Sequence, residues 1–262
     1  MGNRFNRSRR KPLAATIVIA AGLLFSGGGY AVATNVVESN VAPEYTAEQI
    51  SEGRKLFLAN CASCHGLNAE GTAAGPSMIG VGAASVDFQV GTGRMPGQGS
   101  GPQLPKKKVQ FTDEQISLMA AYVASLAPGP AIPEQKYLEA TGDATHGGEL
   151  FRINCAMCHN AVGAAGALTE GKYAPNLNGV EAKHVYEAML IGPQNMPVFN
   201  DANITPQDKQ DIITYLAYIE ENPSAGGFEL GSLGPVAEGL FIWIFGLGLI
   251  IAITVWLGAK SN

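Results

Sequence analysis

The sequence predicts an all-α protein in which one small helical domain occurs twice and is followed by a membrane helix. Three observations support this prediction. The pentapeptide Cys-x-x-Cys-His occurs at Cys61–His65 and again at Cys155–His159. The residues around the first copy recur around the second, about 94 positions later. A run of 21 residues without a charge extends from Gly239 to Ala259, which is long enough to cross a bilayer as a helix.

The N-terminal segment, residues 1–37, is expected to direct export. Residues 1–12 are basic, and an apolar run from Leu13 to Phe25 precedes small residues at Ala31 and Ala33, the pattern of a cleavable signal peptide. No charge occurs from Leu13 to Val37, so the same stretch is long enough for a retained anchor helix, which we favour. Both interpretations leave the basic end in the cytoplasm and export the domain that comes next.

The first helical domain is predicted over residues 44–127. Thr46-Ala-Glu-Gln49 is a capping box, which predicts a helix that runs through Gly53 and Phe57 into Cys61. A second capping box, Thr112-Asp-Glu-Gln115, predicts a helix that ends the domain near Leu126.

The second domain, residues 142–222, repeats this plan. Gly53 and Phe57 recur as Gly147 and Phe151, and the helix that begins at Thr112 recurs at Thr205, with Pro206 in its first position. A period near 94 is too long for a solenoid repeat and indicates a duplicated domain.

The two copies differ most between Met95 and Thr112, a stretch eight residues longer than its counterpart in the second domain. It contains Lys106, Lys107 and Lys108, the one basic cluster of the exported part. We expect either a solvated loop tip or a docking site for an acidic partner.

Three connecting and anchoring segments complete the chain. A proline-rich linker, residues 128–141, is expected to keep the two domains near each other without fusing them. Residues 223–235 form a tether, and residues 236–259 a transmembrane helix with Trp243 and Trp256 towards its ends. Lys260 after this helix and Glu238 before it place the C-terminus in the cytoplasm.

Composition narrows the class of partner. The chain is 46% hydrophobic and 15% charged, which favours a membrane protein. Its formal net charge is −5, but residues 34–234 alone hold 11 basic and 21 acidic side chains. This acidic part argues against nucleic acid and anionic lipid as partners.

The repeated pentapeptide predicts two covalently bound haem c groups. Two thiols one helical turn apart can each form a thioether with a haem vinyl group, and the adjoining histidine can ligate the iron. A Cys-x-x-Cys pair also occurs in redox dithiols and zinc sites, but zinc requires four Cys or His ligands and each repeat has three. A Met-Pro dipeptide follows each motif, and a methionine sulfur is a common second axial ligand. The predicted covalent attachment residues are Cys61, Cys64, Cys155 and Cys158, and the predicted axial pairs are His65 with Met95 and His159 with Met196.

The predicted iron ligands, one histidine and one methionine at each site, indicate which reaction the haems can carry out. An iron held by His and Met has no open position for dioxygen or peroxide, which suits electron transfer and argues against a dihaem peroxidase. Each ligating histidine needs an acceptor for its other ring nitrogen. Pro76 and Pro175, the first proline after each motif, are placed to offer a backbone carbonyl.

Each domain resembles a class I cytochrome c, in its first helix with glycine and phenylalanine, its Cys-x-x-Cys-His, its Met-Pro and its last helix with Tyr122 or Tyr215. In that family the first and last helices cross at the glycine and the aromatic residues. The whole arrangement resembles the dihaem cytochrome c subunit of the actinobacterial cytochrome bc1 complex.

This resemblance implies a role as the electron-transfer subunit of a quinol:cytochrome c oxidoreductase. It implies cytochrome b and a Rieske iron–sulfur protein as partners, with the Rieske centre reducing the first haem and the second haem reducing a terminal cytochrome c oxidase. The expected location is the plasma membrane, with the haem domains outside the cytoplasm and both termini inside if the N-terminal helix is retained. The alternative is a dihaem subunit of another membrane oxidase or dehydrogenase, which usually carries only an N-terminal anchor.

Overall fold

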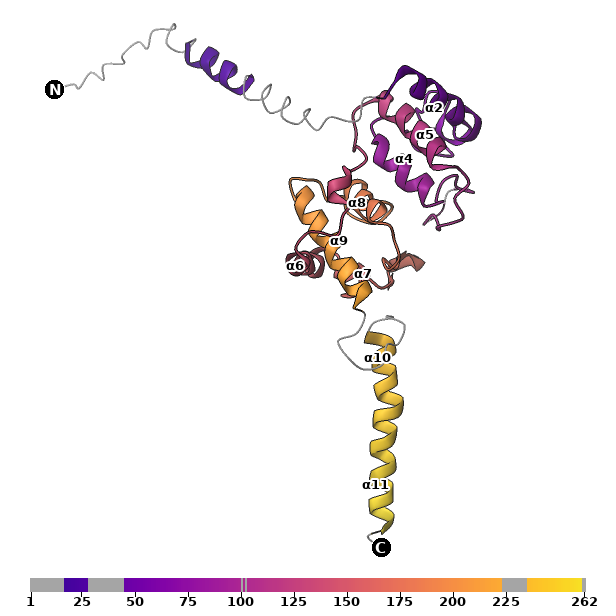
Figure 1. Cartoon of the computed structure of the whole chain (residues 1–262), viewed down its shortest axis with the longest axis vertical. Coiled ribbons are helices and arrows are strands. Elements are labelled where there is room, and N and C mark those ends of the chain that lie inside the picture. The colour runs from indigo at the N-terminus through magenta and orange to yellow at the C-terminus, as the bar shows by residue number, and fades with distance from the viewer. Residues whose placement is uncertain (1–16, 28–44, 100, 102, 223–234, 261–262) are drawn as a thin grey trace, which may run out of the picture. The chain divides into compact units, whose positions relative to one another are not determined.

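The computed structural model describes residues 17–27, 45–99, 101, 103–222 and 235–260 (Figure 1). The chain divides into two compact units, residues 1–44 and 45–262. In the first unit, residues Ile17–Gly27 form an apolar helix that is shorter than a membrane span. The rest of the predicted segment 1–37, including its cleavage site, lies outside the described residues.

The first helical domain contains α2 (Ala47–Asn60), α3 (Ala62–His65), α4 (Gly82–Gly91) and α5 (Asp113–Leu126). Both predicted helix starts are confirmed. The Thr46 hydroxyl accepts a hydrogen bond from the backbone N–H of Gln49, whose side chain accepts one from the Thr46 N–H in return, and Thr112 and Gln115 do the same for α5. These bonds satisfy two of the backbone donors that a helix start leaves without partners.

Helices α2 and α5 cross at Gly53. A Cβ atom at this position would collide with the carbonyl oxygen of Leu118, so only glycine permits the close approach. One turn later, the rings of Phe57 and Tyr122 lie 5.2 Å apart, in the middle of a buried apolar cluster. The crossing expected from the family resemblance is therefore confirmed.

The second domain repeats this architecture with α6 (Ala144–Asn154), α7 (Ala156–His159), α8 (Ala182–Ile191) and α9 (Pro206–Glu221). Helix α9 begins at the Thr205 cap with Pro206 in its first position, as predicted. Gly147 lies against the carbonyl oxygen of Asp211, and the rings of Phe151 and Tyr215 are 5.5 Å apart.

Short elements connect these helices. They are η1 (Gln135–Tyr137), η2 (Thr169–Gly171) and the two-residue strands β1 (Gly166–Ala167) and β2 (Tyr173–Ala174), which pair antiparallel with Gly166 opposite Ala174. Among the described residues, β1 and β2 are the only strands, and all other regular elements are helices.

The two domains contact each other directly, through α4 and α8. The Lys183 ammonium lies 2.8 Å from the Asp87 carboxylate, and the rings of Phe88 and His184 are 6.1 Å apart. The linker also packs on the first domain, since the N–H of Ala84 donates to the carbonyl of Pro130. The linker is expected to keep the two domains near each other without fusing them, and in the structure the domains also contact each other directly, through residues far apart in the sequence.

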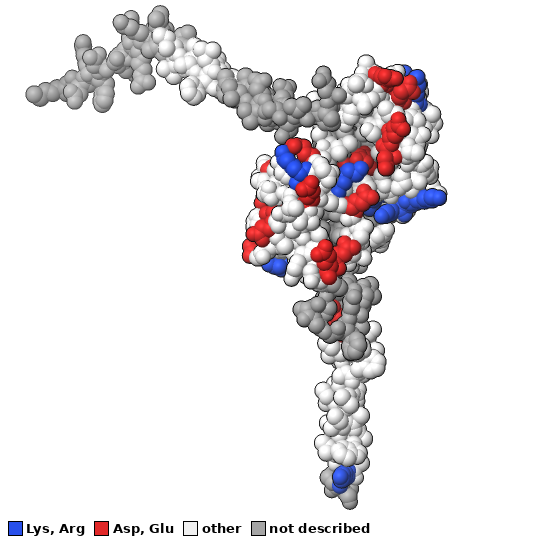
Figure 2. Space-filling model, in the orientation of Figure 1, with Lys and Arg blue, Asp and Glu red and all other residues white. Residues whose placement is uncertain are grey.

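The C-terminal helix consists of α10 (Pro235–Phe241), a π-helical stretch η3 (Ile242–Leu247) and α11 (Gly248–Lys260). Residues Val236–Lys260 are long and apolar enough to span a membrane, and none of their most apolar part is buried in the protein. In Figure 2 acidic side chains outnumber basic ones on the visible face of the two domains, whereas the C-terminal helix shows almost no charge before Lys260. This helix therefore indicates a membrane anchor. Most of the predicted tether lies outside the described residues.

Candidate haem sites

The end of α2 positions the first motif. The N–H of Cys61 donates to Phe57, and the N–H groups of Cys64 and His65 donate back to the carbonyl of Cys61 at 3.1 and 2.9 Å. These bonds wrap the motif into one tight turn, which places the two cysteines on the same side.

The His65 imidazole is buried and oriented from behind. Its Nδ1 lies 2.7 Å from the carbonyl oxygen of Pro76. Gly75 passes so close that a Cβ atom there would be 3.1 Å from the ring. Because Nδ1 is the donor to Pro76, Nε2 is left with its lone pair for a metal.

The second motif has the same geometry. Cys155 ends α6, and Cys158 and His159 donate to its carbonyl at 3.0 and 2.9 Å. Nδ1 of His159 lies 2.9 Å from the carbonyl oxygen of Pro175. Desolvation by burial lowers the pKa of His159, although the bond to Pro175 opposes this, so the ring is held neutral.

The thiols are poorly suited to redox chemistry of their own. Burial raises the pKa of Cys61 to about 11, with a further contribution from Cys64, and it raises that of Cys155 to about 11 in the same way. A redox-active dithiol requires a lowered pKa that favours the thiolate. The environment therefore argues against a dithiol site.

The two predicted methionine ligands return to the domain of their own motif. Met95 follows α4, with its N–H bonded to the carbonyl of Gln89, and packs against the same apolar cluster as Cys61. Met196 lies in the loop after α8 and packs against the cluster that contains Cys155. The described structure thus brings each methionine back to its own domain core.

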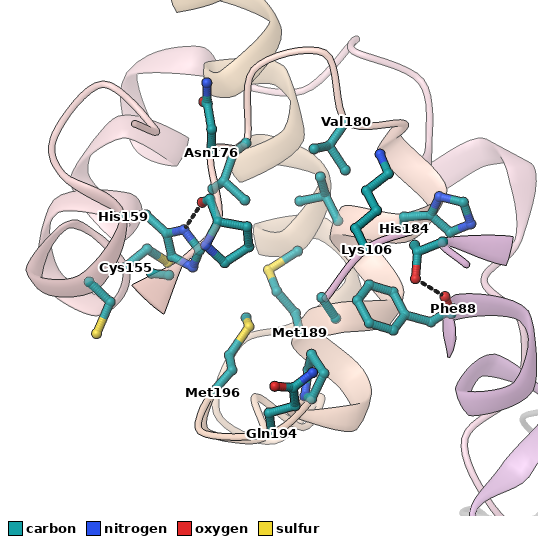
Figure 3. Close-up of a pocket in the computed structure, with 18 of the residues that line it drawn as sticks. Phe88, Lys106, Cys155, His159, Asn176, Val180, His184, Met189, Gln194 and Met196 are labelled. Carbon is teal, nitrogen blue, oxygen red and sulfur yellow. Dashed lines mark hydrogen bonds between the residues drawn. The ribbon is translucent and has the colours of Figure 1, made fainter. Parts of the chain in front are cut away.

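A cavity of about 420 Å³ joins the predicted residues of the second site (Figure 3). Cys155, Cys158, His159 and Met196 all line it. Its apolar lining includes Phe151, Leu177, Val185, Met189, Phe199, Ile212 and Leu216. Two thiols, an imidazole and a thioether around an apolar cavity fit a haem c.

Several residues that shape these sites are not among those predicted from the sequence. Gly166 packs so tightly on the carbonyl of Cys158 that a Cβ atom would collide with it. Gly75 could have been found from the sequence, because the Gly-Pro dipeptide that it forms with Pro76 predicts a turn. Phe88 and Arg94 line the second cavity although they belong to the first domain, and no local signal in the sequence indicates this.

Both domains match known protein families. Residues 50–127 match the family described as cytochrome c, and residues 142–216 match the one described as cytochrome C oxidase, cbb3-type, subunit III. The chain is 40% identical to the cytochrome bc1 complex cytochrome c subunit of Corynebacterium efficiens, over 97% of the chain and 92% of that protein. It is also 40% identical to the subunit of the same name from Mycobacterium tuberculosis H37Rv, over 98% of the chain and 95% of that protein. The chain belongs to the family of cytochrome bc1 complex cytochrome c subunits.

The likeness to cbb3-type oxidases is more limited. The Cbb3-type cytochrome c oxidase subunit FixP of Sinorhizobium medicae is 32% identical over 56% of this chain and 50% of that protein. The bc1 family relatives instead match nearly the whole chain. The predicted family and fold class are therefore confirmed, and two cytochrome c domains imply haem c as the cofactor and electron transfer as the function.

Proposed function

We propose that this chain is the dihaem electron-relay subunit of a quinol:cytochrome c oxidoreductase of the cytochrome bc1 type. It accepts electrons from a Rieske iron–sulfur centre, in a complex with cytochrome b, and delivers them through two haems to a terminal cytochrome c oxidase. The observation that carries the proposal is the cavity that joins Cys155, Cys158 and His159 to Met196, in a chain 40% identical to bc1 complex cytochrome c subunits.

The four cysteines attach the haems. Each thiol would add across one vinyl group of a haem, with the sulfur bonded to one carbon and the hydrogen to the other, so attachment would need no oxidant. Cys61 and Cys64 would hold the first haem in this way, and Cys155 and Cys158 would hold the second. When bound, each haem c supplies a one-electron iron couple.

The axial residues restrict the site to electron transfer. His65 and His159 would hold the iron through Nε2, because the carbonyls of Pro76 and Pro175 accept hydrogen bonds from Nδ1. Met95 and Met196 would supply the second ligand of each iron, which would leave no position for an external ligand. A soft thioether sulfur also favours the reduced iron, which suits an acceptor downstream of quinol.

The C-terminal helix limits how far this relay can travel. Anchored by Val236–Lys260 in the plasma membrane, the two domains work at its extracytoplasmic surface and cannot act as a freely diffusing carrier. Their acidic surface disfavours nucleic acid as a partner (Figure 2).

Removing each methionine tests the axial assignment. We expect the reduced wild-type protein to bind no carbon monoxide, and Met95→Ala and Met196→Ala each to bind one molecule per chain, because each opens one position. Met157→Ala is the matched control, since Met157 belongs to the second motif but is 91% exposed. A Met196→Ala protein that still excludes carbon monoxide contradicts the assignment.

Purification in mild detergent tests the partners. A C-terminal tag should bring down cytochrome b and a Rieske protein with two haems per chain. Recovery of an oxidase without either of these proteins refutes the bc1 assignment and favours a subunit of another membrane oxidase.

A further inference from the structure

In the long loop after Met95, residues 103–108 are held against the second domain by two reciprocal side-chain amides. The Gln103 side chain donates to the carbonyl of Tyr173 at 2.7 Å and accepts from its N–H at 2.9 Å. From the other domain, Gln194 donates to the carbonyl of Leu104 and accepts from its N–H, both at 3.1 Å. Each amide thus satisfies both backbone groups of a residue in the opposite domain.

These contacts fall beside both walls of the second haem site. Tyr173 lies two residues before Pro175, whose carbonyl orients His159. Gln194 lies two residues before Met196 and has a positive φ of 59°, which is unusual for a residue other than glycine. The loop is therefore tied to the segments that precede both predicted axial contacts.

As a result, the first domain supplies part of the wall of the second cavity. Phe88, Arg94, Leu104 and Lys106 line it together with the haem-binding residues of the second domain. In Figure 3, Cys155 and His159 lie at one end of the cavity, Lys106 and Phe88 at the other, and Met196 and Met189 between them.

The charges on this wall are mainly positive, in contrast to the acidic surface of the domains. The cavity is lined by Arg94, Lys106 and Lys172, but by a single carboxylate, that of Glu181. Lys172 pairs with Glu170 at 3.3 Å. Arg94 stacks over the Phe88 ring at 4.8 Å, and neither it nor Lys106 makes a hydrogen bond or ion pair with another described residue. Arg94 is half-buried, and a half-buried cation without an anionic partner points to an anion in the cavity. Lys106 is exposed at the edge of the same cavity and adds positive charge there.

The substituents of a haem supply that anion in the right place. The vinyl groups, which Cys155 and Cys158 would hold, lie on one edge of the macrocycle, and the two propionate carboxylates lie on the opposite edge. Attachment at the cysteine end directs the carboxylates towards the end that the first domain closes.

We propose that residues 103–108 form an interdomain clasp through which the first domain completes the second haem pocket, with Lys106 and Arg94 as counter-ions for the carboxylates of that haem. This inference rests on the proposed function, because it requires a haem held by His159 and Met196. The clasp adds a role to the basic loop, which is attached to the second domain at Gln103 and Leu104. Positive charge beside the second haem stabilises its reduced form and favours electron arrival there.

Potentiometric titration of the full-length dihaem protein tests the clasp. In Lys106→Gln we expect the ratio of reduced to oxidised second haem to fall about three- to tenfold at fixed ambient potential, or roughly 30 to 59 mV at 59 mV per tenfold change. Lys108→Gln is the matched control, since it removes the same charge two residues away. Both lysine side chains are exposed, but only that of Lys106 lines the cavity. Equal shifts in the two variants, or no shift in Lys106→Gln, overturn the proposal.

A Met196→His variant identifies which step of the redox titration belongs to the second haem, because histidine in place of methionine lowers the potential of that haem.

A second measurement addresses the clasp itself. The Gln103→Ala, Gln194→Ala double variant should lower the potential of the second haem in the same direction and increase amide hydrogen exchange across residues 103–108. An unchanged potential together with faster exchange rejects the role in the haem pocket and leaves only a structural contact. Failure of the proposed function gives a different result. The wild-type protein would then lack two haems, or Met196→His would change the reduction potential of neither haem.

Discussion

Replacing Gly147 with alanine tests the helix crossing on which the second domain is built. An added Cβ atom would collide with the carbonyl oxygen of Asp211 and lie 2.8 Å from the backbone nitrogen of Ile212. Backbone atoms cannot rotate away as a side chain can, so α6 and α9 must separate, which loosens the Phe151–Tyr215 contact.

The magnitude follows from two opposing effects. Overpacking a core contact costs about 1–3 kcal/mol, and a backbone obstacle places this case at the upper end. Alanine recovers about 1 kcal/mol of helix propensity relative to glycine. We therefore expect a net loss of about 2 kcal/mol, or roughly 8–16 °C in melting temperature for a domain of this size.

Gly148→Ala is the matched control for this prediction. Gly148 is the next residue of the same helix, and its added Cβ atom would meet only side chains, chiefly the Tyr215 ring at 3.0 Å, which can shift. The assay is thermal unfolding of the full chain followed by circular dichroism, comparing the transition of the second domain in the two variants. If both variants melt at the same temperature, the helix crossing does not require glycine and the argument fails.

Three further predictions concern buried and titrating side chains. Burial raises the pKa of Glu187 to about 9, and repulsion from Asp87 adds to the effect. Because the folded protein keeps the proton that the unfolded chain releases above pH 4.5, the free energy of unfolding should fall as pH rises from 4.5 towards 9. The slope is at most about 1.4 kcal/mol per pH unit. Glu187→Gln should remove this slope, and thermal melts from pH 5 to 9 with a constant difference from wild type contradict it. The ammonium of Lys209 is fully buried and lies 2.7 Å from Asp201, so Asp201→Asn should cost roughly 2 kcal/mol in denaturant unfolding, less than for a fully buried pair because Asp201 is partly exposed. The hydrogen bond to Asp211 raises the pKa of the exposed His146, and proton NMR should show that pKa falling in Asp211→Asn; an unchanged titration refutes the assigned cause.

Much of the fold could be predicted because its signals are local. A Thr followed three residues later by Gln or Asp marks the start of α2, α5 and α9, since the capping bonds form within one turn. The duplicated glycine and phenylalanine positions located both helix crossings, because so close a contact excludes any side chain. The Cys-x-x-Cys-His motifs predicted the candidate sites for the same reason, since their residues lie within one helical turn.

The sequence alone therefore determined the family, the duplicated helical domains, the candidate haem residues and the membrane helix, all of which depend on residues near one another in the chain. Only the tertiary structure decided how the two domains meet. The pairing of Gln103 with Tyr173 and of Gln194 with Leu104 joins residues 70 and 90 positions apart, and neither glutamine stands in a recognisable motif. The basic loop after Met95 was visible in the sequence, but its place in the wall of the second cavity depends on the packing of α4 against α8. A contact between two separately folded surfaces leaves no periodicity or spacing in the chain, and so it could be found only in three dimensions.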